Sequence, residues 1–332
     1  MPPRVRHMPI PVTVNQRGDW DFIVIEKKVL VPMDDDPENF RTNGGQVSTH
    51  TGLSDVVPNH KAILREDTGR VFYIGSDKYQ PVPHRTVLGP VITALSHNTH
   101  RTTVKSVDHG AKVFADFIST STVNIGAESY RGGIRIVNSL DGTFRLSIEG
   151  FLFRERDQSC IVLSETLSSF CRVHVVGQFT NSDFARIART TLETVVSRLV
   201  SLQAVAGVRI TEVAFRQLIG RIDMPAKYKK LAYDIWETPD IAQIDETMTG
   251  TIGAVLNLLA YLGTHEITQT LNDEAVYRWQ RNVDSVLSRQ LRTVLGDGAT
   301  MAQPDHAIIT SSERIVTTPH GIAPNMDLKQ EV

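Results

Sequence analysis

The chain has 332 residues, of which 41% are hydrophobic and 22% are charged, a composition typical of a globular protein with a sizeable core. Its formal net charge of −2 gives no overall attraction to nucleic acid, so such binding would require a locally basic surface. No run approaches the roughly 18 apolar residues of a membrane helix, and the start lacks the apolar segment of a signal peptide. We therefore expect a cytoplasmic protein that does not bind membranes.

The N-terminal half shows the signals of strands and turns. Residues 1–19 hold four prolines and predict an extended arm, whereas alternation over 20–31 predicts one or two strands. Residues 39–59, rich in Gly, Ser, Thr and Asn, predict a loop. A hairpin over 62–75 should turn at Asp67-Thr68-Gly69, with an ion pair between Glu66 and Arg70. After it we expect a short helix and two strands, over 90–97, 102–108 and 112–118.

The clearest strands lie between Tyr130 and Leu163, where apolar residues alternate with arginines. A three-residue loop over 140–142 would pair Ile136 with Leu146, Ile134 with Ile148, and Arg135 with Ser147. Gly142 would then supply the positive φ of the turn. This hairpin, over 134–148, would have one buried apolar face that includes Phe144, and one solvent-exposed face that is basic and hydroxylic.

After Val176 the hydrophobic period changes from two to 3.6 residues, which is the signature of helices. The longest predicted helix, over 182–206, carries an apolar stripe formed by Phe184, Ile187, Leu192, Val195, Leu199 and Leu202. Further helices are predicted over 212–221, 226–236, 248–264 and 273–294. Strands followed by helices predict an α+β fold in which an antiparallel sheet packs against a mostly helical C-terminal half.

The predicted organisation is one domain between two flanking segments. The domain spans 20–295 and is β-rich over 20–178 and α-rich over 179–295. Residues 1–19 form the arm, and residues 296–332, with five acidic and two basic residues, predict a flexible acidic tail. Cys160 and Cys171 both lie in apolar, strand-like surroundings and are expected to be buried thiols.

Motifs for enzymatic chemistry are incomplete or missing. The sequence lacks both the phosphate-cradling G-x-x-x-x-G-K-[ST] loop and the G-x-G-x-x-G fingerprint. His265-Glu266-Ile267-Thr268-Gln269 has glutamine where a zinc protease needs its second histidine. His97, His100 and His109 have no cysteine nearby, and Asp21, Glu26 and Lys28 are spaced too closely for a nuclease centre to be favoured over solvated strand charges. We expect no enzyme, no metal site and no cofactor.

A basic and aromatic pattern is the strongest functional signal. Five arginines and three acids lie between Arg131 and Arg156, interleaved with aromatic residues. Guanidinium groups bind phosphates and aromatic rings stack on unpaired bases. Predicted phosphate contacts are Arg131, Arg135, Arg145, Arg154 and Arg156, predicted stacking residues are Tyr130 and Phe153, and Lys227, Lys229 and Lys230 would extend the path. A third cluster, Tyr277 to Arg281, lies on the last helix. For any single cluster, a solvated face whose aromatic residues belong to the core is the commoner arrangement, and the three clusters together favour nucleic acid.

Several short motifs occur in an order that resembles a known family. They are Arg65-Glu66-Asp67-Thr68-Gly69, Tyr79-Gln80-Pro81-Val82, Gly110-Ala111-Lys112-Val113-Phe114 and Asn138-Ser139-Leu140-Asp141-Gly142-Thr143, followed by the helix from Ser182 and a late helix with Asn257 and Tyr261. In this order the chain resembles the phage- and plasmid-encoded domain family of unknown function number 932. The resemblance spans roughly residues 60 to 290 and implies a viral protein that acts on DNA in the host cytoplasm.

The leading hypothesis is an oligomeric phage protein that binds single-stranded DNA without sequence preference during replication, recombination or transcription. The resemblance implies likeness to strand-annealing proteins or to the single-stranded-DNA-binding RNA polymerase cofactors of N4-like phages, with a phage RNA polymerase or replication proteins as partners. One alternative is a structural or interaction protein of phage whose basic sheet face binds protein. A metal-dependent nuclease is the third.

Overall fold

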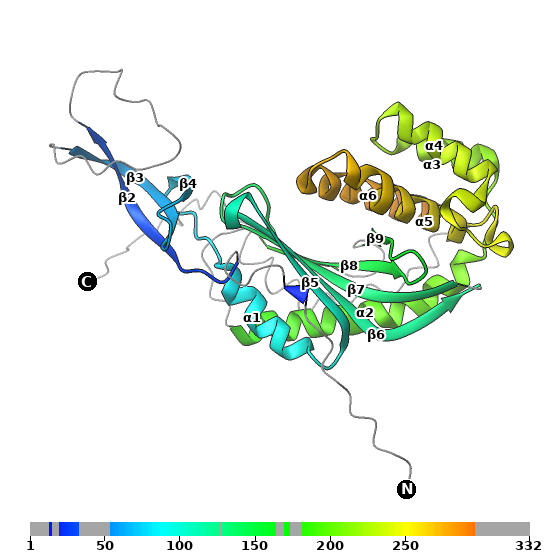
Figure 1. The fold of residues 1–332 in the computed structure, drawn as a ribbon, viewed down its shortest axis with the longest axis horizontal. Coiled ribbons are helices and arrows are strands. Elements are labelled where there is room, and N and C mark those ends of the chain that lie inside the picture. The colour runs from blue at the N-terminus through cyan, green and yellow to red at the C-terminus, as the bar shows by residue number, and fades with distance from the viewer. Residues whose placement is uncertain are drawn as a thin grey trace, which may run out of the picture.

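The computed structural model describes residues 13–14, 20–32, 54–126, 128–163, 169–172 and 181–295 (Figure 1). Two sheets occupy the N-terminal half and most helices the C-terminal half, which confirms the predicted α+β class. The predicted arm, apart from Thr13–Val14, and the predicted tail over 296–332 lie outside the described residues, as does the side chain of Cys171. Within the described part, no helix is both long and apolar enough to span a bilayer.

The larger sheet forms the centre of the molecule. Its strands have the order β1-β5-β6-β7-β8-β10, with β9 also paired to β8, and only β1 runs parallel to its neighbour. These strands are β1 (Thr13–Val14), β5 (Thr99–Val107), β6 (Lys112–Ile125), β7 (Glu128–Ser139), β8 (Leu146–Arg154), β9 (Cys160–Val162) and β10 (Ser169–Arg172).

Helices lie on both sides of this sheet (Figure 1). On one side are α1 (His84–Leu95) and α2 (Asn181–Ala206). On the other are α3 (Glu212–Arg221), α4 (Ala226–Glu237), α5 (Ile252–Tyr261) and α6 (Asp273–Leu295). The predicted stripe of α2 is buried in full against β6, β7 and β8, where each large apolar side chain contributes about 1.5–3 kcal/mol. Gly132 of β7 allows α2 to approach closely, because a Cβ there would lie 2.8 Å from Val195.

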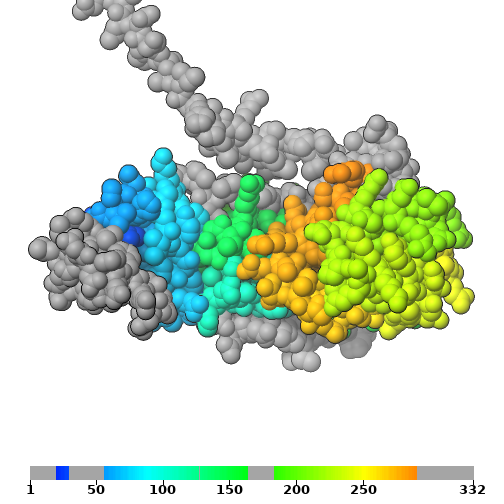
Figure 2. Space-filling model, turned by 90° about the horizontal axis from the view of Figure 1, so that it is seen from above, coloured from blue at the N-terminus to red at the C-terminus, as the bar shows by residue number. Residues whose placement is uncertain are grey.

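The smaller sheet projects from the body. It consists of β2 (Val24–Pro32), β3 (Ser54–Arg65) and β4 (Val71–Ser76) in that order. Seen from above, these strands and helices α3–α6 occupy opposite ends of the molecule, with residues of the main sheet between them (Figure 2). Beyond the end of β4, only β2 and β3 remain paired, so the outer part of the projection is a two-stranded ribbon.

Several local predictions require correction. The helix predicted over 248–264 is α-helical only from Ile252 to Tyr261, with a 3-10 turn over 246–248 before it and a π-helical turn over 262–266 after it. The short helix begins at His84 rather than near residue 90, with Pro90 inside it. The loop predicted over 39–59 is wrong at its end, because β3 already begins at Ser54. The hairpin turn carries its positive φ at Gly69, as its sequence indicates, but the turn carboxylate of Asp67 pairs with Arg65, at 2.7 Å, instead of Glu66 pairing with Arg70.

The predicted register of the β7–β8 hairpin is wrong by two residues, although the alternation of side chains along the two strands is correct. Ile136 lies opposite Ile148, and Arg135 lies opposite Glu149. The loop is longer because Leu140 is fully buried and its backbone N–H bonds to Ala111, at 2.7 Å. The Ser139 hydroxyl accepts from the backbone N–H of Phe144, and Gly142 has the expected positive φ of 74°. A shift by two residues preserves side-chain alternation, so Ile134, Ile136, Leu146 and Ile148 share the core face.

Candidate functional site: the charged faces of the main sheet

The predicted basic face of the main sheet is covered by helix α6. Asp116 of β6 lies opposite Arg135 of β7, which lies opposite Glu149 of β8, and these side chains face away from α2. Gln280 and Tyr277 of α6 contact them from above. The prediction that Arg135 lies on a solvent face is therefore wrong. Alternating apolar and polar residues in a strand predict a polar face, but they do not show whether water or a polar helix covers that face.

The donors of Arg135 are occupied within the protein. Its Nε and Nη2 donate to the two oxygens of Asp116, at 2.6 and 2.8 Å, and its Nη1 donates to Gln280. Burial alone lowers the pKa of this guanidinium, but the adjacent Asp116 outweighs burial and raises it. The Cys160 thiol lies 3.8 Å away, and burial raises its pKa, so the sulfur stays protonated at neutral pH.

Glu149 and Tyr277 continue this layer. The Tyr277 hydroxyl donates to Glu149 Oε1, at 2.7 Å, and Arg281 lies 3.5 Å from the same oxygen. Burial raises the pKa of Tyr277, and the charge of Glu149 acts in the same direction. Phe144 packs edge-on against Tyr277, with ring centroids 5.2 Å apart, and is absent from the main core cluster. Its predicted place on the core face is thus wrong, and it joins the α6 side instead.

A lysine surrounded by carboxylates lies where α6 begins. The Lys112 ammonium contacts Asp108 at 2.5 Å, Asp141 at 2.9 Å and also Glu274, and its side chain is only 6% exposed. Burial lowers the pKa of Lys112, but the bonds to the three carboxylates more than compensate and raise it. This cluster joins the β5–β6 turn, the β7–β8 loop and α6.

The aromatic residues of this face are buried under arginines. Phe153 is 5% exposed, and the Arg101 guanidinium stacks over its ring at 4.9 Å. Arg131 donates to Glu155, at 2.5 Å, and to the carbonyl of Thr120. Phe153 is therefore not placed for the predicted stacking on bases, and Arg131 is not placed for the predicted phosphate contact, because each already has a partner inside the protein.

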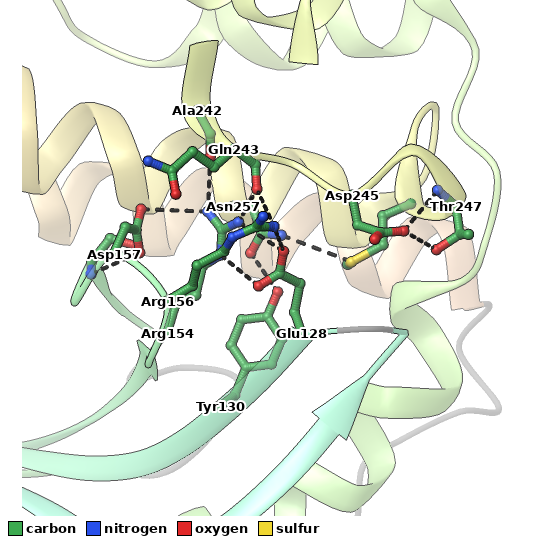
Figure 3. A network of polar contacts seen from close by, with 12 residues as sticks. Glu128, Tyr130, Arg154, Arg156, Asp157, Ala242, Gln243, Asp245, Thr247 and Asn257 are labelled. Atoms are coloured by element: carbon green, nitrogen blue, oxygen red, sulfur yellow. Dashed lines mark hydrogen bonds and ion pairs between the residues drawn. The ribbon is translucent and has the colours of Figure 1, made fainter. Parts of the chain in front are cut away.

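Arg154 lies on the opposite face of the sheet from Arg135. No bulge interrupts β8, so its even-numbered side chains point toward the core. Arg154 is 1% exposed and bonds to Glu128, at 3.0 Å, and to the backbone carbonyls of Ala242 and Gln243 (Figure 3). Arg156 reaches the same Glu128 carboxylate at 2.9 Å but is half exposed. Both arginines point toward the segment that precedes α5.

Tyr130 belongs to the same network. Its hydroxyl donates to Asn257 of α5, at 2.6 Å, and its ring is 2% exposed (Figure 3). Burial raises the pKa of this phenol. The predicted role of Tyr130 in base stacking does not fit this position, since the ring is part of the core.

The remaining predicted contacts lie elsewhere. Lys227 and Lys230 are exposed on α4, where the Lys227 ammonium lies 4.5 Å from the ring of Tyr228. Lys229 bonds to the carbonyl of Gly220 at 3.1 Å. Arg145 is exposed in the β7–β8 loop and makes no ion pair within the described residues. The structure therefore does not gather the ten predicted residues into one surface.

The residues considered for a nuclease centre, Asp21 and Glu26, do not form a shared site. Asp21 lies 4.0 Å from Arg85, while Glu26 pairs with Lys61 at 2.8 Å, so each carboxylate has its own cation. Among the described residues, no cluster of three or more histidine, cysteine, aspartate and glutamate side chains is arranged to hold a metal ion.

Several residues of these networks escaped prediction from the sequence. Glu128 and Asp116 are not among the predicted residues, although they hold Arg154 and Arg135. Gln280 belongs to the third predicted cluster, but its contact with Arg135 is not predicted. One signal was present: a carboxylate next to an arginine on paired strands is the usual partner of a buried guanidinium. The backbone partners at Ala242 and Gln243 had no sequence signal, because their position depends on how the helical half packs.

No family model, curated protein or solved structure matches this chain.

Proposed function

We propose that this protein is a non-enzymatic interaction protein that contacts another protein through its projecting sheet, β2–β3–β4. The observation that carries the proposal is the exposure of apolar side chains on a sheet that extends away from the core. Ile74 is 56% exposed and Val56 is 47% exposed, and the ribbon beyond β4 has only two strands. A two-stranded ribbon is marginally stable in water by itself, so a partner surface would stabilise it.

The internal pairing of the main-sheet arginines supports this choice. Arg131, Arg135 and Arg154 each bond to a carboxylate inside the protein, and releasing a buried arginine from its partner would cost about 3–5 kcal/mol. An interaction protein is thus favoured over the DNA hypothesis. The proposed contact surface is the smaller sheet and not the basic face of the main sheet that the sequence predicts.

Site-specific photocrosslinking in cells tests the proposal. A photoreactive phenylalanine analogue replaces Ile74, and a control carries it at Val213, which is 67% exposed on α3 at the other end of the molecule. We expect a discrete crosslinked species, identified by mass spectrometry, from position 74 and none from position 213. Identical diffuse crosslinking at both positions, or none at position 74, would contradict the proposal.

Binding of single-stranded DNA is the second candidate, now restricted to the exposed cations Arg145, Arg156, Lys227 and Lys230. The exposure of Lys227 and Lys230 on one helix favours it. If α4 contacts the strand, replacing both lysines by glutamate should weaken binding at least tenfold at low salt, because two phosphate contacts become repulsive. The measurement is fluorescence anisotropy with a labelled oligonucleotide. The matched control replaces Lys27 and Lys28, which are exposed on β2, by glutamate and should leave binding through α4 unchanged. Equal affinity of all variants would exclude this surface.

A further inference from the structure

Strand β4 has one partner and one open edge. Within the described strands it pairs only with β3. The Asp77 N–H donates to the Asn59 carbonyl at 3.0 Å, and the pairing of Lys61 with Gly75 continues this alternation. The backbone groups of Ile74 and Ser76 therefore point away from β3, toward the open edge.

The open edge of β4 lacks the charges and prolines that usually prevent pairing, and its one irregularity is at Phe72, which has no partner in β3 because the register shifts between Tyr73 and Val71. Its sequence, Val-Phe-Tyr-Ile-Gly-Ser, has no charge and no proline. The opposite edge strand, β2, is protected by Glu26, Lys27 and Lys28 and by an irregularity in its pairing. Edge strands without charges are ready templates for another strand.

Charges flank β4 with opposite signs. Arg70 directly precedes the strand and Asp77 directly follows it, and both are exposed. Neither side chain makes an ion pair within the part of the chain that the structure describes. An antiparallel neighbour with the same sequence would bring the positive start of one strand to the negative end of the other, whereas a parallel neighbour would place like charges together.

We infer that β4 pairs antiparallel with β4 of a second copy of this chain, joining two projecting sheets into one continuous sheet. The inference deepens the proposed function, on which it rests, by naming the partner. It also gives the predicted homo-oligomer a specific interface, which is isologous because both copies use the same surface.

The alternation of backbone groups limits the register. The alternation is regular from Tyr73 to Ser76 and shifts by one residue at Phe72. Counted along the chain, a twofold axis at Tyr73 places Phe72 opposite Ile74 of the second copy, and brings Arg70 near Ser76 and Asp77. An axis at Ile74 would place Arg70 opposite Lys78, a repulsive pair. The charges therefore favour the axis at Tyr73.

Sedimentation velocity of the full-length chain over about two decades of micromolar concentration tests the inference, since a contact of one strand pair is small and its association weak. We expect a concentration-dependent shift from monomer to dimer. Arg70→Asp alone or Asp77→Arg alone should weaken dimerisation about tenfold, because each reversal makes two contacts repulsive in the symmetric dimer. The combined charge exchange should restore dimerisation to within about threefold of the original chain.

Two further variants separate the interface from the fold. Ile74→Lys should abolish dimerisation, whereas Val213→Lys, at an even more exposed site on α3, should leave it unchanged. A strictly monomeric original chain, or a combined exchange no better than the single reversals, would overturn the inference. The proposed function would survive that result if position 74 still crosslinked to a different protein in cells, so the two failures are distinguishable.

Discussion

At the scale of single residues, Lys112 shows how one cation organises three segments of chain. Burial raises the pKa of Asp141, but hydrogen bonds from Thr143 and Lys112 bring it below its ordinary value of 3.8. A carboxylate with a lowered pKa contributes stability above its ordinary pKa, and that stability disappears as the pH falls through the folded-state value. The raised pKa of Lys112 has the opposite effect on the pH dependence of stability. Its contribution is present at lower pH and is lost as the pH rises through the folded-state pKa of Lys112, which lies above 10.5.

Lys112→Met should therefore destabilise the protein in a pH-dependent way. We expect the free energy of unfolding to fall by about 3 kcal/mol at pH 7, because three carboxylates lose their shared cation. The deficit should shrink below pH of about 4, where the carboxylates of the variant become protonated. Urea unfolding of the variant and the original chain at several pH values measures this difference in free energy. Lys105→Met, which removes the exposed pair with Asp273, should cost less than about 1 kcal/mol, and an equal loss in both variants would contradict the argument.

At the scale of elements, four of the helices in the C-terminal half were predictable, whereas the start of α1, the bounds of α5 and the coverage of the main sheet were not. The bounds of α3 match the prediction, and those of α2, α4 and α6 match within one residue, because a 3.6-residue period and clear termini are local signals. Which side chains of β7 and β8 share the core face, such as Ile134, Ile136, Leu146 and Ile148, also followed from alternation. Its register did not, since the buried Leu140 lengthens the loop through a tertiary contact with Ala111.

The candidate site depended on information that the sequence does not carry locally. Alternating arginines specify a polar face. Whether that face meets water or a helix depends on where a segment 145 residues later packs, as Arg135 and Gln280 show. The alternation of odd and even positions does place Arg154 on the core side of β8, once the strand is known to lack a bulge. The edge of β4 was hidden for a similar reason, because the sequence predicts a hairpin but not which of its strands remains at the edge.

At the scale of the whole molecule, the β-rich and α-rich halves share one core. A single apolar cluster includes Trp20, residues of α1 and α2, and Trp279 of α6. The network around Arg154 connects the end of the main sheet to the segment before α5 (Figure 3). Continuous packing and a shared buried ion pair both oppose independent unfolding of the halves, so we predict one cooperative domain over the described part of residues 20–295.

Tryptophan fluorescence provides the test, since Trp20 reports on the β-rich half and Trp279 on the α-rich half. In variants that keep one tryptophan and replace the other two by phenylalanine, both probes should change at the same urea concentration. Arg154→Met should lower both midpoints equally and cost about 3–5 kcal/mol, because it leaves the buried Glu128 poorly compensated. Arg156→Met, the half-exposed partner of the same carboxylate, should cost less than about 1 kcal/mol. If Arg154→Met moved only the Trp279 transition, the two halves would be separate folding units joined at this network.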